Sequence, residues 1–396
     1  MSAARLGGSS ATGLVMSSKD ILYFTIGGRG CYAIAAFSNG TVAWNKRLVG
    51  SVWDNYRVFP PALANDESAV YYSCLGALFA LDPVSGTFIW NASSPSGMPV
   101  VASSGILIVA GNAFKPPSGN MSNVAAFDGS SGKFLWSGDV YNDDYLAACT
   151  LDETEKVCVT GTLRNGAGSA VYGLSIADGS LLWQQKYSYG AVYNPVRGYA
   201  LIKNGVAYVP MDGFGFVGLD VVTGNKVYNG SRDYTSVTAP ISLYLEAGSN
   251  DTLMMGYRSG FEYESEAFCA YDAGSYRSHD CKTLKISIQN TSYPFPVTSQ
   301  PVGIATNSQN CIFNFASLDL NHFCAVTADN MVLVTIASLD SGWGQLRGYD
   351  ISRGNELAWT SDSVQLCVAS PPIVARDGSI FLLDKYGVLY TFRVVN

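Results

Sequence analysis

A short pattern recurs along the chain: an apolar run ends in Asp, a Ser-Gly or Thr-Gly turn follows, and a second apolar run ends in an aromatic residue. Residues 78–90 (LFALDPVSGTFIW) and 124–136 (VAAFDGSSGKFLW) are two clear copies. The closing aromatic residues recur at intervals of 45 to 47 residues, at Trp44, Trp90, Trp136, Trp183 and Tyr228. Each copy predicts a β-hairpin, and a period of this length filled with short strands is typical of propeller blades.

The other half of each period predicts two more short strands, separated by Asn, Asp, Gly or Ser turns, as in residues 60–73 and 200–209. We therefore expect an all-β fold, an eight-bladed β-propeller of four-stranded antiparallel blades, in one domain over residues 1–396. The expected blades are residues 11–48, 58–93, 98–138, 145–186, 194–230, 238–288, 299–361 and 370–395.

The last expected blade has only three strands. A strand near residues 2–6 beside residues 387–395 would supply the fourth and close the ring, which removes unpaired sheet edges. Seven blades are the alternative, depending on how residues 290–345 are divided. Residues 323–328 and 331–336 are read as a surplus strand pair in that region.

Composition excludes several classes of protein. Charged residues make up 14% of the chain and the net charge is −7, without a cluster of Lys or Arg, so nucleic acid is not an expected partner. No apolar run approaches the roughly 18 residues of a membrane span, and no 3.6-residue period indicates a long helix. We expect a monomer.

The repeat resembles the quinoprotein, or PQQ-like, β-propeller superfamily, in which eight blades are locked by tryptophans docked between sheets. The matching positions are Asp82/Gly86/Trp90, Asp128/Gly132/Trp136, Asp220/Gly224/Tyr228 and Asp350/Gly354/Trp359; two further copies keep Gly40/Trp44 and Gly179/Trp183 without the Asp. Physically, Asp can accept hydrogen bonds from turn amides, Gly can take a positive φ, and a buried Trp adds apolar contact. Trp44, Trp90, Trp136, Trp183, Tyr228 and Trp359 are therefore read as structural residues.

The resemblance implies two kinds of function, because the superfamily includes dehydrogenases that carry pyrroloquinoline quinone with calcium and shorter, non-catalytic binding platforms. The chain lacks the adjacent Cys-Cys pair of those dehydrogenases and any Cys-x-x-Cys-His haem site. We expect a non-enzymatic platform without a cofactor that binds a protein, peptide or glycan. A quinone-dependent dehydrogenase is the alternative, and a purely structural role is a third possibility.

Other potential sites are weak. The only histidines, His279 and His322, cannot build a multi-histidine metal centre, and no motif surrounds a nucleophilic serine. Residues 129–133 (GSSGK) imitate a phosphate loop but lie in a hairpin turn. The carboxylate runs 143–144 and 262–266 are typical of solvated loops.

Localisation signals conflict. The first residues have no apolar signal-peptide core, yet six Asn-x-Ser/Thr sequons occur, at Asn39, Asn91, Asn120, Asn229, Asn250 and Asn290. Among nine cysteines the closest pairs, at positions 149/158, 269/281 and 311/324, have spacings that suit bridges across a hairpin or between strands. We expect a secreted or otherwise extracytoplasmic glycoprotein.

Aromatic and charged residues gather in the linkers between blades. In a four-stranded blade these linkers emerge on the same face as the loops that join the second and third strands. Such surfaces commonly bind proteins or carbohydrates, although these aromatic residues could equally pack the linkers together. The candidate ligand-binding residues are Trp53, Arg57, Tyr145, Tyr193, Asp233, Arg258, Trp343 and Lys385.

Overall fold

The computed structural model shows only β-strands as regular secondary structure in the residues that it describes. These are residues 2–5, 10–28, 30–50, 58–117, 119–138, 140, 146–162, 169–187, 200–211, 215–230, 240–247, 252–259, 265–272, 278–279, 286–287, 324–326, 331–337, 343–350, 356–362, 364–365, 372–383 and 388–393. Within them, no helix has the length and apolar character needed to cross a membrane.

The described strands form eight antiparallel sheets. The first sheet contains β2 (Ser10–Met16), β3 (Ile21–Gly28), β4 (Gly30–Phe37) and β5 (Val42–Val49). The second contains β6 (Ala62–Leu63), β7 (Val70–Cys74), β8 (Ala77–Leu81) and β9 (Phe88–Ser93). The third contains β10 (Pro99–Val101), β11 (Ile106–Phe114), β12 (Ser122–Asp128) and β13 (Phe134–Ser137). The fourth contains β14 (Thr150–Leu151), β15 (Val157–Gly161), β16 (Ser169–Ser175) and β17 (Leu181–Tyr187).

The remaining sheets follow the same antiparallel plan. The fifth contains β18 (Leu201–Lys203), β19 (Val206–Met211), β20 (Gly215–Asp220) and β21 (Lys226–Gly230). The sixth contains β22 (Pro240–Ala247), β23 (Thr252–Ser259), β24 (Ser265–Asp272), β25 (Ser278–His279) and β26 (Ile286–Ser287). The seventh contains β27 (Cys324–Val326), β28 (Met331–Ala337), β29 (Trp343–Asp350), β30 (Glu356–Thr360) and β31 (Val364–Gln365). The eighth contains β32 (Ile373–Val374), β33 (Ile380–Leu383), β34 (Val388–Phe392) and β1 (Ser2–Arg5).

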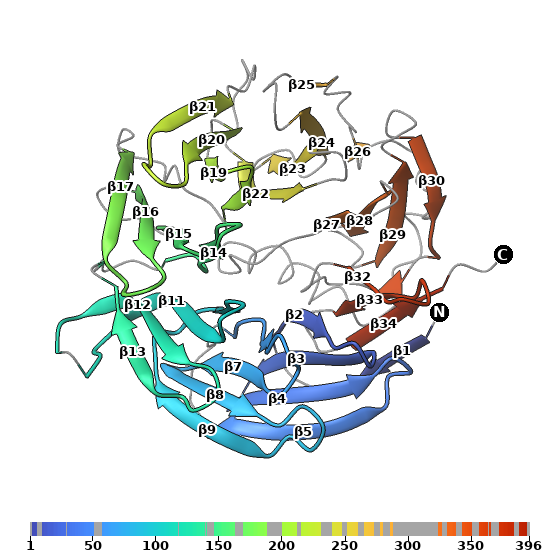
Figure 1. The fold of residues 1–396 in the computed structure, drawn as a ribbon. Coiled ribbons are helices and arrows are strands. Elements are labelled where there is room, and N and C mark those ends of the chain that lie inside the picture. The colour runs from blue at the N-terminus through green and yellow to red at the C-terminus, as the bar shows by residue number, and fades with distance from the viewer. Residues whose placement is uncertain are drawn as a thin grey trace.

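The sheets follow one another around a ring, with the first strand of each sheet toward the centre and the last toward the outside (Figure 1). The two ends of the chain share one sheet, because β1 pairs antiparallel with β34 from Ser2↔Thr391 to Arg5↔Val388. The expected surplus pair is assigned differently: β27 and β28 are the first two strands of the seventh sheet. The strands expected at 301–305 and 311–315 lie outside the described residues.

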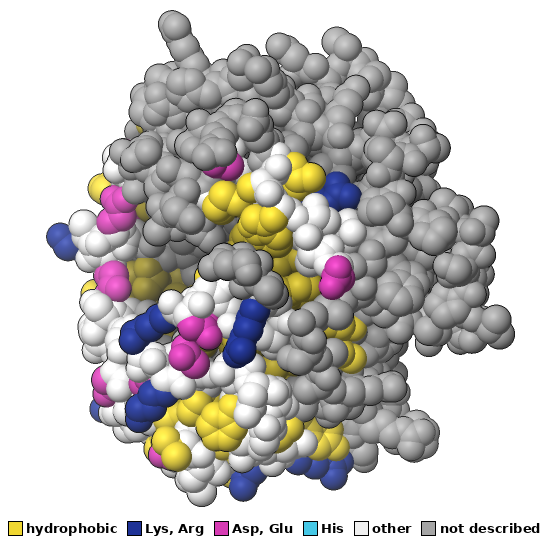
Figure 2. Space-filling view, turned by 90° about the vertical axis from the view of Figure 1, so that its right-hand side faces the viewer, with side chains coloured by type: hydrophobic (Ala, Val, Ile, Leu, Met, Phe, Trp, Pro, Cys, Tyr) yellow, Lys and Arg dark blue, Asp and Glu magenta, His cyan; other side chains and the backbone are white. Residues whose placement is uncertain are grey.

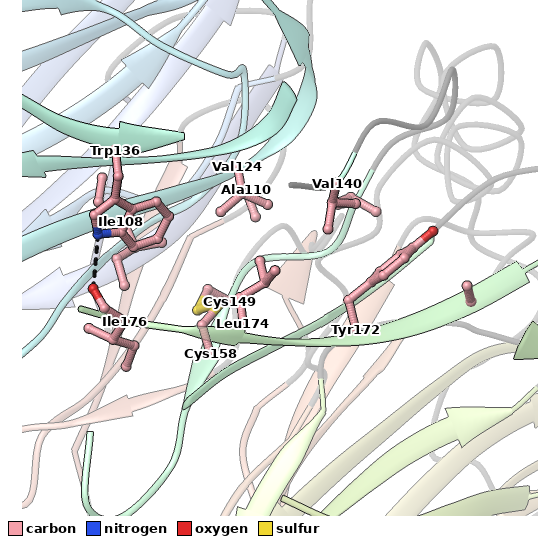
Figure 3. Close-up of a cluster of buried hydrophobic side chains, with 13 residues drawn as sticks. Ile108, Ala110, Val124, Trp136, Val140, Cys149, Cys158, Tyr172, Leu174 and Ile176 are labelled. Carbon is pink, nitrogen blue, oxygen red and sulfur yellow. Dashed lines mark hydrogen bonds between the residues drawn. A yellow bond between two sulfur atoms is a disulfide. The ribbon is translucent and has the colours of Figure 1, made fainter. Parts of the chain in front are cut away.

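The core lies between neighbouring sheets. β7 and β15 are buried at every position, whereas the outer strands β9 and β17 are largely exposed or partly buried, with Trp183 the buried exception. One cluster, which includes Ile108, Val124, Trp136, Leu174 and Ile176, joins the third sheet to the fourth (Figure 3). Apolar side chains on both faces of a middle strand are removed from water by packing against the adjacent sheets. Each sheet is therefore stabilised mainly by its two neighbours.

Four repeat tryptophans in the described residues reach from their own blade to the next. The indole nitrogens of Trp44, Trp90, Trp136 and Trp183 donate to the carbonyls of Pro83, Gly129, Ile176 and Val221, at 2.9, 2.9, 2.9 and 2.7 Å. The repeat glycine of the next blade lies against the ring: a Cβ at Gly86, Gly132, Gly179 or Gly224 would lie only 2.4 to 2.6 Å from it. Each of these glycines also has a positive φ, between 66° and 75°. The glycine therefore serves both its own turn and the preceding tryptophan.

The repeat aspartate organises the turn before that glycine. Asp128 Oδ1 accepts hydrogen bonds from the backbone nitrogen and hydroxyl of Ser131 and from the hydroxyl of Ser130, at 2.7 to 2.8 Å. These bonds lower the pKa of Asp128 to about 2, because they stabilise the carboxylate. Asp82 and Asp220 make equivalent contacts, and their pKa values are lowered in the same way.

A β-bulge precedes each closing aromatic residue in the outer strands. In the third sheet Phe127 pairs with Phe134 but Ala126 pairs with Trp136, so Leu135 is the extra residue. The same shift occurs in the first, second, fourth, fifth and seventh sheets. A bulge re-aims the next side chain and disturbs an otherwise regular strand edge, which makes edge-to-edge aggregation less favourable.

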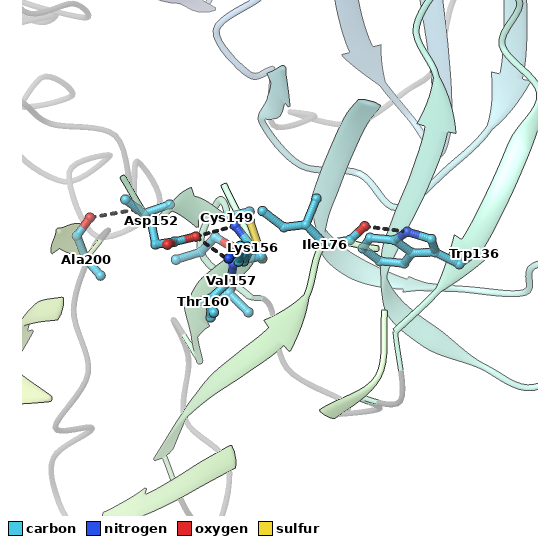
Figure 4. Close-up of a disulfide and its surroundings, with 11 residues drawn as sticks. Trp136, Cys149, Asp152, Lys156, Val157, Thr160, Ile176 and Ala200 are labelled. Atoms are coloured by element: carbon cyan, nitrogen blue, oxygen red, sulfur yellow. Dashed lines mark hydrogen bonds between the residues drawn. A yellow bond between two sulfur atoms is a disulfide. The ribbon is translucent and has the colours of Figure 1, made fainter. Parts of the chain in front are cut away.

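Two disulfides lie in the described part. Cys149–Cys158, a pair that spacing singled out, bridges the residue before β14 to β15 within the fourth sheet (Figure 4). Cys31–Cys74, which sequence spacing did not indicate, joins β4 of the first sheet to β7 of the second. The cysteines of the other expected pairs have no described side chains.

Candidate functional site: a pocket on the linker face

The linkers between sheets and the loops between second and third strands emerge at the same end of the sheets, called here the linker face. Among the eight candidate residues, Trp53, Arg57, Tyr145, Tyr193, Asp233 and Lys385 lie outside the described residues. The backbones of the other two reach this face: Arg258 is one residue from the end of β23, and Trp343 begins β29. The structure does not describe their side chains.

A pocket of about 510 Å³ opens on the described part of the linker face. Four stretches of its wall come from the linkers and loops of the first three sheets. Phe59 belongs to the linker after the first sheet, and Leu75 and Gly76 form the turn between β7 and β8. Ser93, Ser94 and Ser96 come from the end of β9 and the linker after it, and residues 112–115 from the end of β11 and the loop that follows. This pocket, named the linker pocket below, is thus built from segments far apart in sequence.

Hydrogen bonds fix the turn at one side of the linker pocket. Leu75 and Gly76 have φ values of 54° and 77°, as expected for the two central residues of a tight hairpin turn of type I′. The Gly76 nitrogen donates to Ser96 Oγ at 2.6 Å, and the Ser94 nitrogen donates to the Gly76 carbonyl at 3.0 Å. The buried Cys31–Cys74 bridge immediately precedes this turn. The turn is therefore anchored both to the linker and to the first sheet.

Two glycines allow the linker to lie directly against β11. A Cβ at Gly97 would lie 1.7 Å from the carbonyl oxygen of Ala110, and one at Gly111 would lie 2.1 Å from that of Ser96. The Asn112 nitrogen donates to the Ser96 carbonyl at 3.2 Å across this contact. Any larger residue at 97 or 111 would push the backbones apart and change the wall of the pocket.

The remaining walls combine apolar and polar side chains. Phe59 is 8% exposed, and its carbonyl accepts a 2.8 Å hydrogen bond from the buried hydroxyl of Thr25. Phe114 is partly buried and Lys115 is exposed. None of the described residues that line the pocket is acidic, so among them Lys115 supplies the only charge, and that charge is positive. Such a mixture of aromatic walls, hydroxyls and one cation is suited to binding rather than to proton transfer.

Sequence reasoning predicted the linker face but not this pocket. Phe59, Ser96, Phe114 and Lys115 were not singled out, because none stands in a conspicuous aromatic or charged run. One signal was available: residues 112–122 lengthen the loop between the second and third strands of the third blade.

The opposite face is formed by short turns that contact one another. The Ser18 hydroxyl donates to Glu67 Oε2 at 2.8 Å between the first and second sheets. The Ser103 nitrogen donates to Glu155 Oε2 at 2.7 Å, and the Asn204 nitrogen donates to Glu153 Oε1 at 2.8 Å. These three glutamates therefore make contacts between neighbouring sheets. In one side view, Lys and Arg side chains are interspersed with Asp and Glu (Figure 2).

No two cysteines are adjacent in the sequence, and the described bridges join cysteines 43 and 9 positions apart. Within the described ranges, no three His, Cys, Asp or Glu side chains are close enough together to hold a metal ion.

Comparisons with known proteins give one family and many similar folds. A family model, PQQ_2, described as "Outer membrane protein assembly factor BamB", matches residues 2–152 and 120–261. No curated protein matches the sequence.

Solved structures resemble the whole chain at low sequence identity. BamB from Moraxella catarrhalis is 14% identical, with a TM-score of 0.59, over 100% of this chain and 98% of that one. Sqt1 from Saccharomyces cerevisiae is 10% identical, with a TM-score of 0.67, over 100% and 99%. A quinohemoprotein alcohol dehydrogenase from Comamonas testosteroni is 13% identical, with a TM-score of 0.65, over 99% of this chain but 75% of that one. At these identities the likeness shows the fold alone.

Proposed function

Because this chain belongs to the PQQ-like family described as outer membrane protein assembly factor BamB, we propose that it is a non-enzymatic propeller that binds a partner protein on its linker face. The linker pocket is the observation that carries the proposal, since three sheets contribute to it and two glycine contacts and a disulfide hold its walls. The solved structures include both BamB and a dehydrogenase, so the fold alone does not choose between binding and catalysis.

The proposal includes eight blades closed into a ring by the pairing of β1 with β34. Eight sheets in the described residues and the apolar cluster between the first and last sheets, including Phe24 and Phe381, support it. A rigid closed ring gives the pocket walls fixed positions, which lowers the entropic cost of binding.

The proposal also places the protein outside the cytoplasm. Two disulfides with buried cysteines support an oxidising compartment, and the family description refers to outer-membrane assembly. Asn39, Asn91 and Asn120 are exposed, so each of these sequons is accessible to a glycan. Enzymatic release of N-glycans from the native protein in ¹⁸O-water, followed by mass spectrometry, should mark Asn39 and Asn91; unmarked asparagines would contradict the glycoprotein assignment.

Site-specific photo-crosslinking tests the binding face. A photoreactive phenylalanine at Ser93 or Met121, next to the linker pocket, should crosslink the same partner in the native compartment. The matched positions Ser104 and Ser130, exposed in turns of the opposite face, should not. Crosslinks from the opposite face alone, or none from the linker face, would contradict the proposal.

A second measurement addresses catalysis. Addition of pyrroloquinoline quinone and calcium should leave the thermal unfolding midpoint unchanged and produce no dye-linked alcohol oxidation. A stoichiometric bound chromophore with turnover would instead establish the dehydrogenase alternative.

A further inference from the structure

The charge of the linker pocket differs from that of the whole protein. The chain carries a net charge of −7, yet the lining residues that the structure describes include Lys115 and no Asp or Glu. An anionic group therefore meets repulsion over much of the protein but a local cation at this opening. This contrast favours a ligand that presents a negative charge to the position of Lys115.

The pocket also has apolar walls. Phe59, Leu75 and Phe114 line it, and Phe114 and Leu75 are only partly buried. Apolar surface that a ligand removes from water contributes about 25 cal/mol per Å². A small inorganic anion would leave these side chains in water, whereas an apolar side chain close to a carboxylate would cover them.

The backbone at the pocket favours an extended chain. β10 pairs with β11 only as far as Val109, so Gly111–Phe114 continues past the end of β10. Two linkers each contribute one backbone bond there, from the Asn112 nitrogen to the Ser96 carbonyl and from the Leu146 nitrogen to the Gly111 carbonyl. The hydroxyls of Ser93 and Ser96 also line the pocket. An extended peptide can use a strand end and hydroxyls of this kind with its own amide groups.

We propose that the linker pocket binds an extended peptide segment that carries a large apolar residue and, within a few positions, an Asp or Glu whose carboxylate pairs with Lys115. The proposal rests on the proposed function, because it specifies what the partner presents to the linker face. The apolar residue occupies the space beside Phe59 and Phe114, and the carboxylate sets the direction of the segment.

Selection from a displayed library of random octapeptides, with the purified full chain as bait, tests the preference. Enriched peptides should combine Phe, Leu, Ile or Met with Asp or Glu at a fixed spacing. Binding of one synthetic enriched peptide, followed by fluorescence anisotropy, should weaken as salt is raised from 0.05 to 0.5 M, because the screening length falls from about 14 Å to about 4 Å and weakens a partly exposed ion pair.

A charge swap tests whether Lys115 is the residue that pairs with the carboxylate of the peptide. Lys115→Glu should lower the affinity for the peptide about 10-fold. A second peptide, in which Lys replaces the acidic residue, should regain most of that affinity with the Lys115→Glu variant but not with the natural protein. Lys133→Glu is the matched control, because Lys133 is an exposed lysine in a turn between third and fourth strands on the opposite face. It should leave the affinity unchanged.

Three outcomes would overturn the inference: no enriched peptide, enriched peptides without an acidic preference, or equal effects of Lys115→Glu and Lys133→Glu. Lys115-dependent binding on a glycan array instead of the peptide library would also overturn it. The proposed function is judged separately, because photo-crosslinks from Ser93 and Met121 report a partner on the linker face whatever that partner presents to the pocket.

Discussion

At the scale of single residues, the repeat glycine has two separable roles. Gly132 has a φ of 71°, and a Cβ there would lie 2.6 Å from the Trp90 ring. Gly105 has a φ of 82° with no atom within 4 Å of the added Cβ. The two positions therefore share the backbone requirement but differ in the space that they leave for a side chain.

Gly132→Ala should lower the free energy of unfolding by about 2 to 4 kcal/mol, because a left-handed backbone cost of about 1 kcal/mol adds to overpacking against Trp90. Gly105→Ala should lower the free energy of unfolding only by the backbone cost of about 1 kcal/mol. Urea unfolding followed by tryptophan fluorescence measures both. Equal losses would mean that the ring contact contributes nothing.

The turn aspartates predict a pH dependence. The pKa of Asp128 falls from 3.8 to about 2 in the folded protein. A lowered folded-state pKa contributes stability that is present above pH 3.8 and is lost as the pH falls toward 2. Asp128→Asn should therefore be less stable than the natural protein at pH 5, with a difference that narrows at pH 2.

Chemical unfolding at pH 5, 4, 3 and 2 would measure this convergence. Ser131→Ala removes one hydroxyl donor from Asp128 and should show a smaller effect with the same direction. A difference that stays constant with pH would show that the carboxylate charge is not involved.

At the scale of strands and connections, the two disulfides should differ in their effect on stability. Cys31–Cys74 closes a loop of 43 positions, and Cys149–Cys158 closes one of 9. In the chain-entropy treatment, the first should stabilise by about 4 kcal/mol and the second by about 2.6 kcal/mol. Cys31→Ala/Cys74→Ala should therefore destabilise more than Cys149→Ala/Cys158→Ala.

Denaturant midpoints of the two double variants would test this order, and peptide mapping without reduction would test the pairings. The reverse order would indicate that packing between the first two sheets, rather than chain entropy, dominates. The first variant should also disturb the linker pocket, because Cys74 precedes its Leu75–Gly76 turn.

The elements that sequence could predict are those encoded within one repeat. The Asp, Gly and Trp positions indicate a hairpin because each acts locally or on the adjacent blade, and the structure confirms four-stranded antiparallel sheets. The bulge at Leu135 leaves no separate sequence signal, since the residue is apolar like its neighbours. The place of residues 323–337 within the seventh blade could not be predicted, because no repeat turn marks where that sheet begins; the structure assigns them to β27 and β28.

The candidate site was less predictable than the fold. Phe59, Ser96 and Phe114 meet in one pocket only after three sheets have packed, and their spacing carries no regularity of its own. Cys31 and Cys74 are separated by nearly one repeat, yet only the approach of β4 to β7 shows that they pair. Sequence thus indicated the linker face, whose role in binding stays a prediction, and tertiary contacts determine which residues line the pocket on it.

At the scale of the whole molecule, β1 is expected to complete the eighth sheet. Ala3→Pro/Ala4→Pro should break its pairing with Tyr390 and Leu389, because proline cannot donate a backbone hydrogen bond. We expect a lower unfolding midpoint and concentration-dependent association through the exposed edge of β34. Thermal unfolding and analytical ultracentrifugation measure these effects.

Ala3→Thr/Ala4→Thr is the matched control, since threonine keeps the amide donors and favours strands. If both double variants unfold and sediment like the natural protein, the pairing of β1 does not close the ring.

Each of the four indoles bonds a carbonyl that lies later in the sequence, which has a consequence for folding during synthesis. While one of the first four blades is the newest to be completed on the ribosome, it holds a tryptophan whose acceptor carbonyl and contacting glycine have not yet been synthesised, as for Trp136 with Ile176 and Gly179. Each newly made turn then covers the previous indole, so the uncovered indole moves toward the C-terminus as translation proceeds. A nascent fragment that ends after one of these blades is therefore expected to expose an uncovered indole at its newest end, and at its other end the face of the first sheet, including Phe24, that packs against the eighth.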